Sequence, residues 1–258
     1  MAAPKVLIMM ADYGHEPTEA TVPYTAFKDA GFDVQFATEN GNAPACDKLL
    51  LEGLSQKILG AKGSVLQDYA KMVASDECKQ PLSWTAPGFS LDPFSLVFLP
   101  GGHDKAVVQI MDSAAVHSLL LDYFPKTRKQ QSDGSTATKA VGAICHGVLV
   151  LANAKDAQGH SVLRECTTAT LPARFEQVAY WGTRVFLGDY YKTYGAGSED
   201  VEVSVKKVLA DPEKQYKCSL GLSPFVVEDE AHNYISARFP GDTEKMAQRM
   251  VEVVKSFA

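Results

Sequence analysis

The 258-residue sequence lacks a long apolar segment at its start. Its opening apolar run, residues 6–11, ends at Asp12, so it is too short for a secretory core and far shorter than the ~20 residues of a membrane span. A block of basic residues is also absent, and 31 acidic against 25 basic side chains give a net charge of −6, which argues against nucleic acid as a partner. We therefore expect a cytoplasmic protein that binds neither a membrane nor nucleic acid.

Cysteine is scarce, and its five positions are scattered, odd in number and never spaced as CxxC. This pattern indicates neither a disulfide framework nor a zinc knuckle. Phosphate-binding and dinucleotide-binding glycine motifs are missing as well, because Gly195-Ala-Gly197 lacks a third glycine and the context of a preceding strand. We therefore expect no cofactor and no metal ion, and a special cysteine has to be recognised by its setting.

Hydrophobic residues make up 46% of the chain, which is enough for a buried core. Four near-continuous apolar runs have the character of buried parallel strands; they are residues 5–10, 32–38, 96–99 and 140–145. Helical patterns follow the first and third runs, at 20–30 and at 105–124. This alternation predicts an α/β fold with a doubly wound, mostly parallel sheet, whose ligands bind at the carboxyl ends of the strands.

The remainder of the chain fits a single domain over residues 1–258. Between 39 and 93 the alternation breaks, and two helical patterns at 49–59 and 65–73 predict an inserted helical cap. Residues 126–139 have no periodicity and are expected to form an exposed loop. The last third predicts a helix with an aromatic-rich loop, two late strands and a final helix; these are residues 171–195, 225–228, 233–239 and 242–257.

The strongest chemical signal lies where the fourth apolar run meets a helix with almost no connecting residues. Cys145, His146 and Gly147 occupy this junction, and so tight a turn is typical of a nucleophile elbow. The helix N-terminus favours a thiolate, so Cys145 is expected to be acidic and reactive. The alternative is a small hydrophobe buried at a strand end. The adjacent imidazole favours the nucleophile, provided that the elbow bends both side chains together.

A second glycine turn, Gly101-Gly102-His103, follows the third strand and is expected at the same edge of the sheet. The N–H of Gly101 or Gly102, with that of His146, is a candidate oxyanion hole. The alternative is a tight exit from a strand. His103 either lines the pocket or is a solvated loop residue, and the sequence does not decide between these.

Glu19 lies in the first turn of the helix after the first strand. Its ordinary role there is compensation of the helix dipole, worth under ~1 kcal/mol. If its side chain reaches Cys145, a buried and protonated carboxyl group can donate a hydrogen bond to the thiolate and later pass its proton to a substrate.

Three segments together resemble the ThiJ/PfpI superfamily: GAICHG at 142–147, PGGH at 100–103 and EATVP at 19–23. The chain length and the inserted cap resemble the heat shock protein 31 branch. This resemblance implies a flavodoxin-like sandwich, usually a homodimer. The cap and the last third of the chain match only loosely.

The resemblance also implies roles for individual residues. Cys145 corresponds to the nucleophile, His146 to its acid/base partner and Glu19 to the carboxyl neighbour of the sulfur. In this branch an acidic residue often orients the histidine, and Glu176 is the first candidate here, ahead of Glu165 and Asp189. Asp104 departs from the pattern, since relatives often have glycine at that position.

Activities known in the branch are cofactor-free conversion of methylglyoxal to lactate, removal of early glycation adducts and holding of unfolded chains. The leading expectation is thus an enzyme, a lyase or hydrolase that acts on a small carbonyl compound through a cysteine nucleophile. A stress chaperone without significant catalysis is the second expectation. A glutaminase-type amidotransferase is the third, with His232 and Glu230 as a faint version of its late histidine–acid pair.

Overall fold

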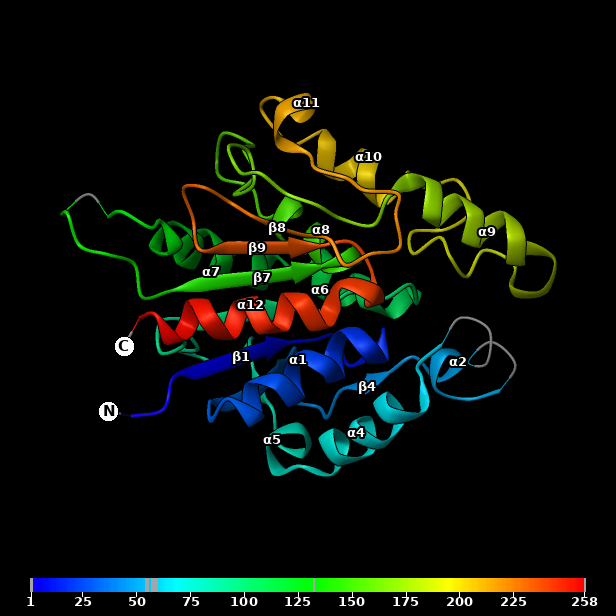
Figure 1. The fold of residues 1–258 in the computed structure, drawn as a ribbon, viewed down its shortest axis with the longest axis horizontal. Coiled ribbons are helices and arrows are strands. Elements are labelled where there is room, and N and C mark those ends of the chain that lie inside the picture. Colours follow the sequence, from blue (N-terminus) through cyan, green and yellow to red (C-terminus); the bar gives the residue numbers. More distant parts are fainter. Residues whose placement is uncertain (1, 54–55, 57–59, 132, 258) are drawn as a thin grey trace.

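The computed structural model describes residues 2–53, 56, 60–131 and 133–257. Its centre is a seven-stranded sheet, parallel except for one edge strand (Figure 1). In spatial order the strands are β5 (Leu82–Ser83), β3 (Asp33–Thr38), β1 (Lys5–Met9), β6 (Leu96–Leu99), β7 (Ala140–Ile144), β9 (Tyr234–Ala237) and the antiparallel β8 (Val226–Glu228). The predicted α/β class, its mostly parallel sheet and all four apolar strands are confirmed, with strand ends shifted by at most one residue.

The central strands are apolar along their whole length because both of their faces are covered. Every residue of β6 and β7 is buried. Ile8 of β1 pairs with Phe36 of β3 on one side and with Phe98 of β6 on the other. Later strands are therefore added on both sides of β1, first β3 on one side and then β6 on the other, so the strand order reverses at β1. The carboxyl ends of β1, β6 and β7 meet beside this switch point, where α/β proteins bind ligands.

Helices cover both faces of the sheet (Figure 1). On one face α1 (Pro17–Asp29) and α12 (Thr243–Lys255) pack against each other and on the strands. On the other face lie α6 (Val108–Met111), α7 (Ala114–Tyr123) and α8 (Val148–Asn153). The predicted final helix is confirmed as α12, and α1 begins three residues earlier than expected because Glu16 caps it.

The single helix predicted over 105–124 is wrong in its continuity. The segment divides into a 3-10 turn, α6 and α7. Asp112 leaves the helical conformation, and the hydroxyl of Ser113 then accepts a hydrogen bond from the N–H of Val116 to start α7. A capping serine inside an apolar periodic pattern thus ends one helix and begins the next.

The segment 39–93 is less purely helical than predicted. It contains β4 (Ala45–Cys46), α2 (Lys48–Leu51), α4 (Gly63–Ala74), α5 (Asp76–Lys79) and β5. Helix α4 confirms the pattern at 65–73 and packs on α1. The pattern at 49–59 falls partly outside the described residues. Strand β4 pairs with β2 (Tyr13–His15) and β5 joins the main sheet, so the segment is tied to the core by backbone pairing.

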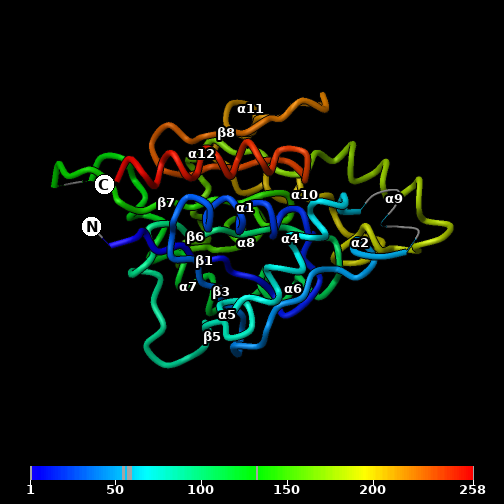
Figure 2. The backbone as a smooth tube through the Cα atoms, turned by 60° about the horizontal axis from the view of Figure 1, so that its bottom comes forward, coloured from blue at the N-terminus to red at the C-terminus, as the bar shows by residue number. Residues whose placement is uncertain are grey.

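The last third adds α9 (Ala173–Leu187), α10 (Val201–Lys206) and α11 (Pro212–Gln215). Strands β8 and β9 confirm the two late strands. Figures 1 and 2 both place α9 and α2 at one end of the molecule and the two termini at the other. The arrowheads of β1, β7 and β9 point toward the end with α9 (Figure 1). Within the described part of the chain, none of the helices has the length and apolar composition of a membrane span.

Candidate functional site

Cys145 directly follows β7 and opens the 3-10 turn Cys145–Gly147, which runs into α8. Its φ is 56°, the one positive value at a non-glycine residue within the described ranges. This conformation costs an L-residue about 1–3 kcal/mol and persists only where the surroundings impose it. Thr170 supplies part of that constraint, because its hydroxyl donates a hydrogen bond of 2.6 Å to the Cys145 carbonyl oxygen. The tight elbow expected from the sequence is therefore present.

Gly101 is the point where the elbow meets the first βα unit. A Cβ atom at this position would lie 2.7 Å from Glu19 Oε2, 2.8 Å from the His146 nitrogen and 2.9 Å from Cys145 Cβ. Real Cβ atoms do not approach other atoms so closely, so only glycine fits. The groups expected to act together thus converge around one residue without a side chain.

Two of the N–H groups expected to form an oxyanion hole, those of Gly101 and His146, make hydrogen bonds within the site. The Gly101 N–H donates a 3.0 Å hydrogen bond to Glu19 Oε2, so it is not directed at a substrate. The His146 N–H is directed at the Cys145 sulfur and favours its ionised form. Gly102 packs against the backbone of residues 14–16, and Gly147 against the Leu99 carbonyl. The two glycine turns therefore serve close backbone packing first.

Cys145 and His146 face each other despite being neighbours in sequence. The distance from Sγ to His146 Nδ1 is 3.4 Å, and both side chains are buried. Burial lowers the pKa of His146 well below its ordinary value, and the nearby His103 and Lys192 lower it further. The imidazole is therefore neutral at physiological pH, and one ring nitrogen has a lone pair available for a hydrogen bond or a transient proton transfer.

The expectation of an acidic Cys145 is wrong for the closed site. Burial raises the pKa of the Cys145 thiol well above its ordinary value, and the neighbouring acidic groups of Glu19 and Glu16 raise it further. The helix N-terminus does not overcome this desolvation, because the sulfur has no exposed surface. The buried site thus favours the protonated thiol of Cys145 over the thiolate.

Two glutamates of the first βα unit share the same buried region. Burial, followed by repulsion from Glu16, raises the pKa of Glu19 well above the usual range. Burial raises the pKa of Glu16 to about 7. Glu16 Oε2 accepts the N–H of Glu19 at 2.7 Å as the cap of α1. Desolvation and repulsion from Glu16 thus both favour the protonated form of Glu19, which is the form that a donor to the neighbouring sulfur requires.

His15 is a contributor that sequence analysis missed. It is buried, and its Nε2 accepts the Ala11 N–H at 2.8 Å, so its Nδ1 carries a hydrogen and donates to the Gly101 carbonyl at 3.0 Å. Burial lowers its pKa to about 4. Neutral His15 thus ties the glycine turn to the first strand. The sequence signal that could have found His15 was its position in the segment that follows β1, at the carboxyl ends of the parallel strands.

Glu176 does not make the expected contact with His146. Its carboxylate accepts hydrogen bonds from Lys192 Nζ at 3.2 Å and from the Val201 N–H at 2.9 Å. Asp189 pairs with Lys105, and Glu165 with Arg164. Among the residues with described placement, no carboxylate is hydrogen-bonded to His146. Charge attraction draws Glu176 to a buried lysine instead.

His103 takes the place beside the imidazole. Its ring lies 4.7 Å from that of His146 and 4.7 Å from that of Tyr191, both edge to face. With Glu16 it lines a cavity of about 250 Å³ whose other walls are mainly apolar: Leu50, Leu171, Phe175, Ala179, Tyr191, Leu222, Phe239 and Pro240. His103 therefore lines a pocket and is not a solvated loop residue. It connects this cavity to the buried Cys145–His146 pair.

His103, Cys145 and His146 together form a candidate set of metal ligands. One donor atom each from His103, Cys145 and His146 lie within 4.8 Å of one another. Cysteine and histidine are ligands that zinc and copper prefer.

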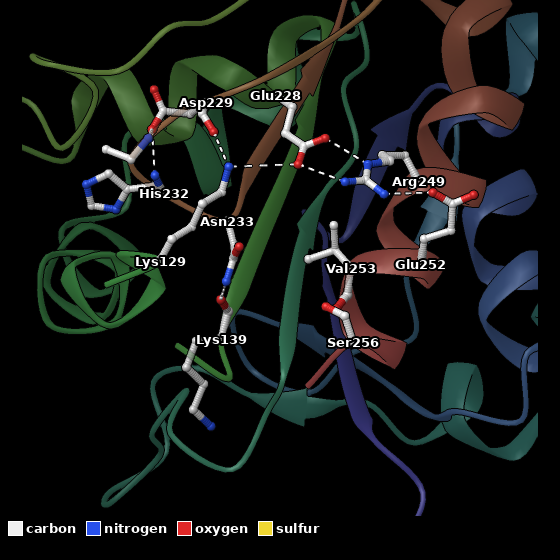
Figure 3. A network of polar contacts seen from close by, with 11 residues as sticks. Lys129, Lys139, Glu228, Asp229, His232, Asn233, Arg249, Glu252, Val253 and Ser256 are labelled. Atoms are coloured by element: carbon white, nitrogen blue, oxygen red, sulfur yellow. Dashed lines mark hydrogen bonds and ion pairs between the residues drawn. The ribbon is translucent and has the colours of Figure 1, made fainter. Parts of the chain in front are cut away.

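His232 and Glu230 do not assemble with Cys145. His232 precedes β9, where its N–H donates to Asp229 Oδ1 at 2.7 Å and its Nδ1 lies 3.0 Å from Thr127 Oγ1. Figure 3 shows His232 among residues at the beginnings of β7 and β9. Cys145 follows the carboxyl end of β7, so the two lie at opposite edges of the sheet. His232 and Glu230 therefore do not form a glutaminase triad with Cys145.

Comparison with known proteins identifies the family of this chain. The model of the ThiJ/PfpI family-like proteins matches residues 10–219. The chain belongs to this ThiJ/PfpI-like family. It is 28% identical over 252 residues to the uncharacterized protein C14C4.04 of Schizosaccharomyces pombe, covering 98% of this chain and 84% of that protein.

Two further proteins that resemble this chain have named activities. The glutathione-independent glyoxalase hsp3102 of Schizosaccharomyces pombe is 28% identical over 148 residues, which cover 55% of this chain and 51% of that protein. The crystal structure of glyoxalase III from Candida albicans superposes with a TM-score of 0.66 at 16% identity, covering 97% of both chains. The structural likeness establishes a shared fold.

The raised pKa of Glu16 predicts a specific pH dependence of stability. Its folded-state pKa of about 7 lies above the ordinary value of 4.5, so stability is lost as the pH rises through this window. Relative to Glu16→Gln, the wild type should lose about 3 kcal/mol of unfolding free energy between pH 4.5 and 7.5. Urea unfolding across this range measures the difference. Glu165→Gln, at an exposed site, should show no such trend, and a flat difference for Glu16→Gln would contradict burial as the cause.

Proposed function

We propose that this protein is a cysteine-dependent, cofactor-free enzyme for small reactive carbonyl compounds, a glutathione-independent glyoxalase that converts methylglyoxal and water to lactate. The observation that carries the proposal is the 3.4 Å approach of Cys145 Sγ to a neutral, buried His146, with protonated Glu19 packed at Gly101. The similarity to two glyoxalases supports the choice of substrate class.

The first step is addition of the Cys145 sulfur to the aldehyde carbon. His146 takes the thiol proton across the 3.4 Å contact and passes it to the carbonyl oxygen as the carbon–sulfur bond forms, so that the imidazole is neutral again. The product is a hemithioacetal. This order suits a thiol with a raised pKa, because the proton leaves only when an electrophile is present and the base stands beside it.

The second step moves a hydrogen between adjacent carbons. Neutral His146 removes the proton from the carbon bonded to sulfur, and the electron pair forms an enediol whose oxygens are stabilised by the Glu19 proton. Return of a proton to the neighbouring carbon gives a lactoyl thioester. Water then cleaves the carbon–sulfur bond, which releases lactate and restores the thiol. Atoms balance as one dicarbonyl and one water per lactate.

Cys145→Ala is expected to lower lactate formation from methylglyoxal by at least about 1,000-fold, because the proposed thioester forms on the Cys145 sulfur. Cys166→Ala is the matched control, since Cys166 is equally buried but lies outside the elbow. Proton NMR of the product, with glutathione absent, measures both. Circular dichroism verifies that both variants fold. Unchanged turnover in folded Cys145→Ala would refute the proposal.

A holding chaperone is the second candidate, and one observation favours it. Helix α9 exposes large apolar side chains to solvent, with Val185 88% and Phe186 87% exposed and Val178 and Trp181 more than half exposed. Apolar groups gathered in this way on one helix are typical of a binding surface. This surface is separate from the buried sulfur.

The two candidate activities are separable by mutation. Val185→Ser with Phe186→Ser should reduce suppression of the thermal aggregation of a client protein at least twofold, because the apolar surface is lost, while methylglyoxal turnover stays within twofold of wild type. Light scattering and the lactate assay provide the two readouts. Cys145→Ala should leave light scattering unchanged. Equal suppression by the serine variant and the wild type would exclude α9 as the chaperone surface.

A further inference from the structure

Three metal-preferring side chains meet at the ends of two neighbouring strands. Cys145 and His146 follow β7, and His103 follows β6, which pairs with β7. One donor atom from each lies within 4.8 Å of the other two. Two of these donors, Sγ of Cys145 and Nδ1 of His146, are 3.4 Å apart. In a tetrahedral zinc site with bonds of about 2.3 Å to sulfur and 2.0 Å to nitrogen, the two donors stand about 3.5 Å apart.

We propose that Cys145, His146 and His103 form a binding site for a single zinc-class or copper-class ion, which occupies the reactive sulfur and switches the enzyme off. The ion binds as the Cys145 thiol releases its proton to solvent and a metal–sulfur bond forms, with no change in oxidation state. The blockade rests on the proposed function, whereas the binding does not.

His103 is the ligand that makes this a site and not merely a cysteine–histidine pair. Its Nδ1 is buried and has no hydrogen-bond partner among the described residues, although buried ring nitrogens are normally satisfied. The side chain is half-buried at the cavity wall, so a small ring movement brings it to bonding distance. A ligand for this nitrogen recovers an interaction that the folded protein otherwise lacks.

The three side chains are a donor set that suits a soft cation. A neutral imidazole ring is the ligand form of histidine, and a thiolate beside imidazole nitrogens is a set of ligands that zinc and copper accept. His103 also lines the cavity that Glu16 borders, so it is the ligand that faces space which an ion or water can enter.

The test is a titration of reduced, metal-free protein with Co²⁺, which reports thiolate ligation through a sulfur-to-cobalt charge-transfer band. Cys218→Ser serves as the background, because Cys218 is the exposed cysteine. One cobalt ion should bind per chain, and Zn²⁺ should displace it. Cys145→Ala should abolish the band, and His103→Ala should weaken binding about tenfold or more. His160→Ala, at a partly exposed histidine outside the site, should bind as the background does.

The proposal is overturned if no charge-transfer band forms, if the band survives Cys145→Ala, or if His103→Ala binds cobalt as tightly as the background. His103→Ala keeps the test decisive should Cys145→Ala fail to fold. Activity is measured separately, where stoichiometric Zn²⁺ should inhibit lactate formation at least tenfold and a chelator should restore it. A metal-free protein without lactate formation contradicts the proposed function alone, because the cobalt band still reports on the site.

Discussion

The site depends on the left-handed backbone of Cys145. This conformation turns the chain from β7 into α8 within three residues and brings the sulfur and the adjacent imidazole to the same side. On a regular strand the two side chains would point to opposite faces. The strained turn is held by the Thr170 hydroxyl and by close packing at Gly101. These contacts offset the cost of the left-handed conformation, which places the sulfur and the imidazole together.

Burial governs the electrostatics of the site more than the helix dipole does. The sulfur, Glu19 and His146 have almost no exposed surface, and desolvation pushes each toward its neutral form. Glu19 and the Cys145 thiol, which pack together at Gly101, do not both ionise, so a proton stays within this pair. A neutral resting site is protected from adventitious oxidation of a free thiolate and still has a base and a proton donor in place when a carbonyl compound arrives.

The elements that the sequence predicted best are those with a single physical determinant. Near-continuous apolar runs mark β1, β3, β6 and β7, and the strand–helix junction marks Cys145. Predictions failed where the outcome depends on residues that are distant in the sequence. The pKa of Cys145 depends on burial that no local pattern records, and Glu176 is drawn to Lys192, which lies 16 residues further along the chain. Thr170 and His15 act through single long-range hydrogen bonds, which have no periodic signature.

The central claim is that Glu19 keeps its proton at neutral pH beside Cys145. Infrared spectroscopy of the wild type at about pH 8 tests it most directly, because Glu16, whose pKa is about 7, is then mostly ionised while its repulsion of Glu19 is kept. The account predicts a protonated carboxyl stretch that disappears in Glu19→Gln. A wild-type spectrum without that stretch would mean that Glu19 is ionised and would contradict the account.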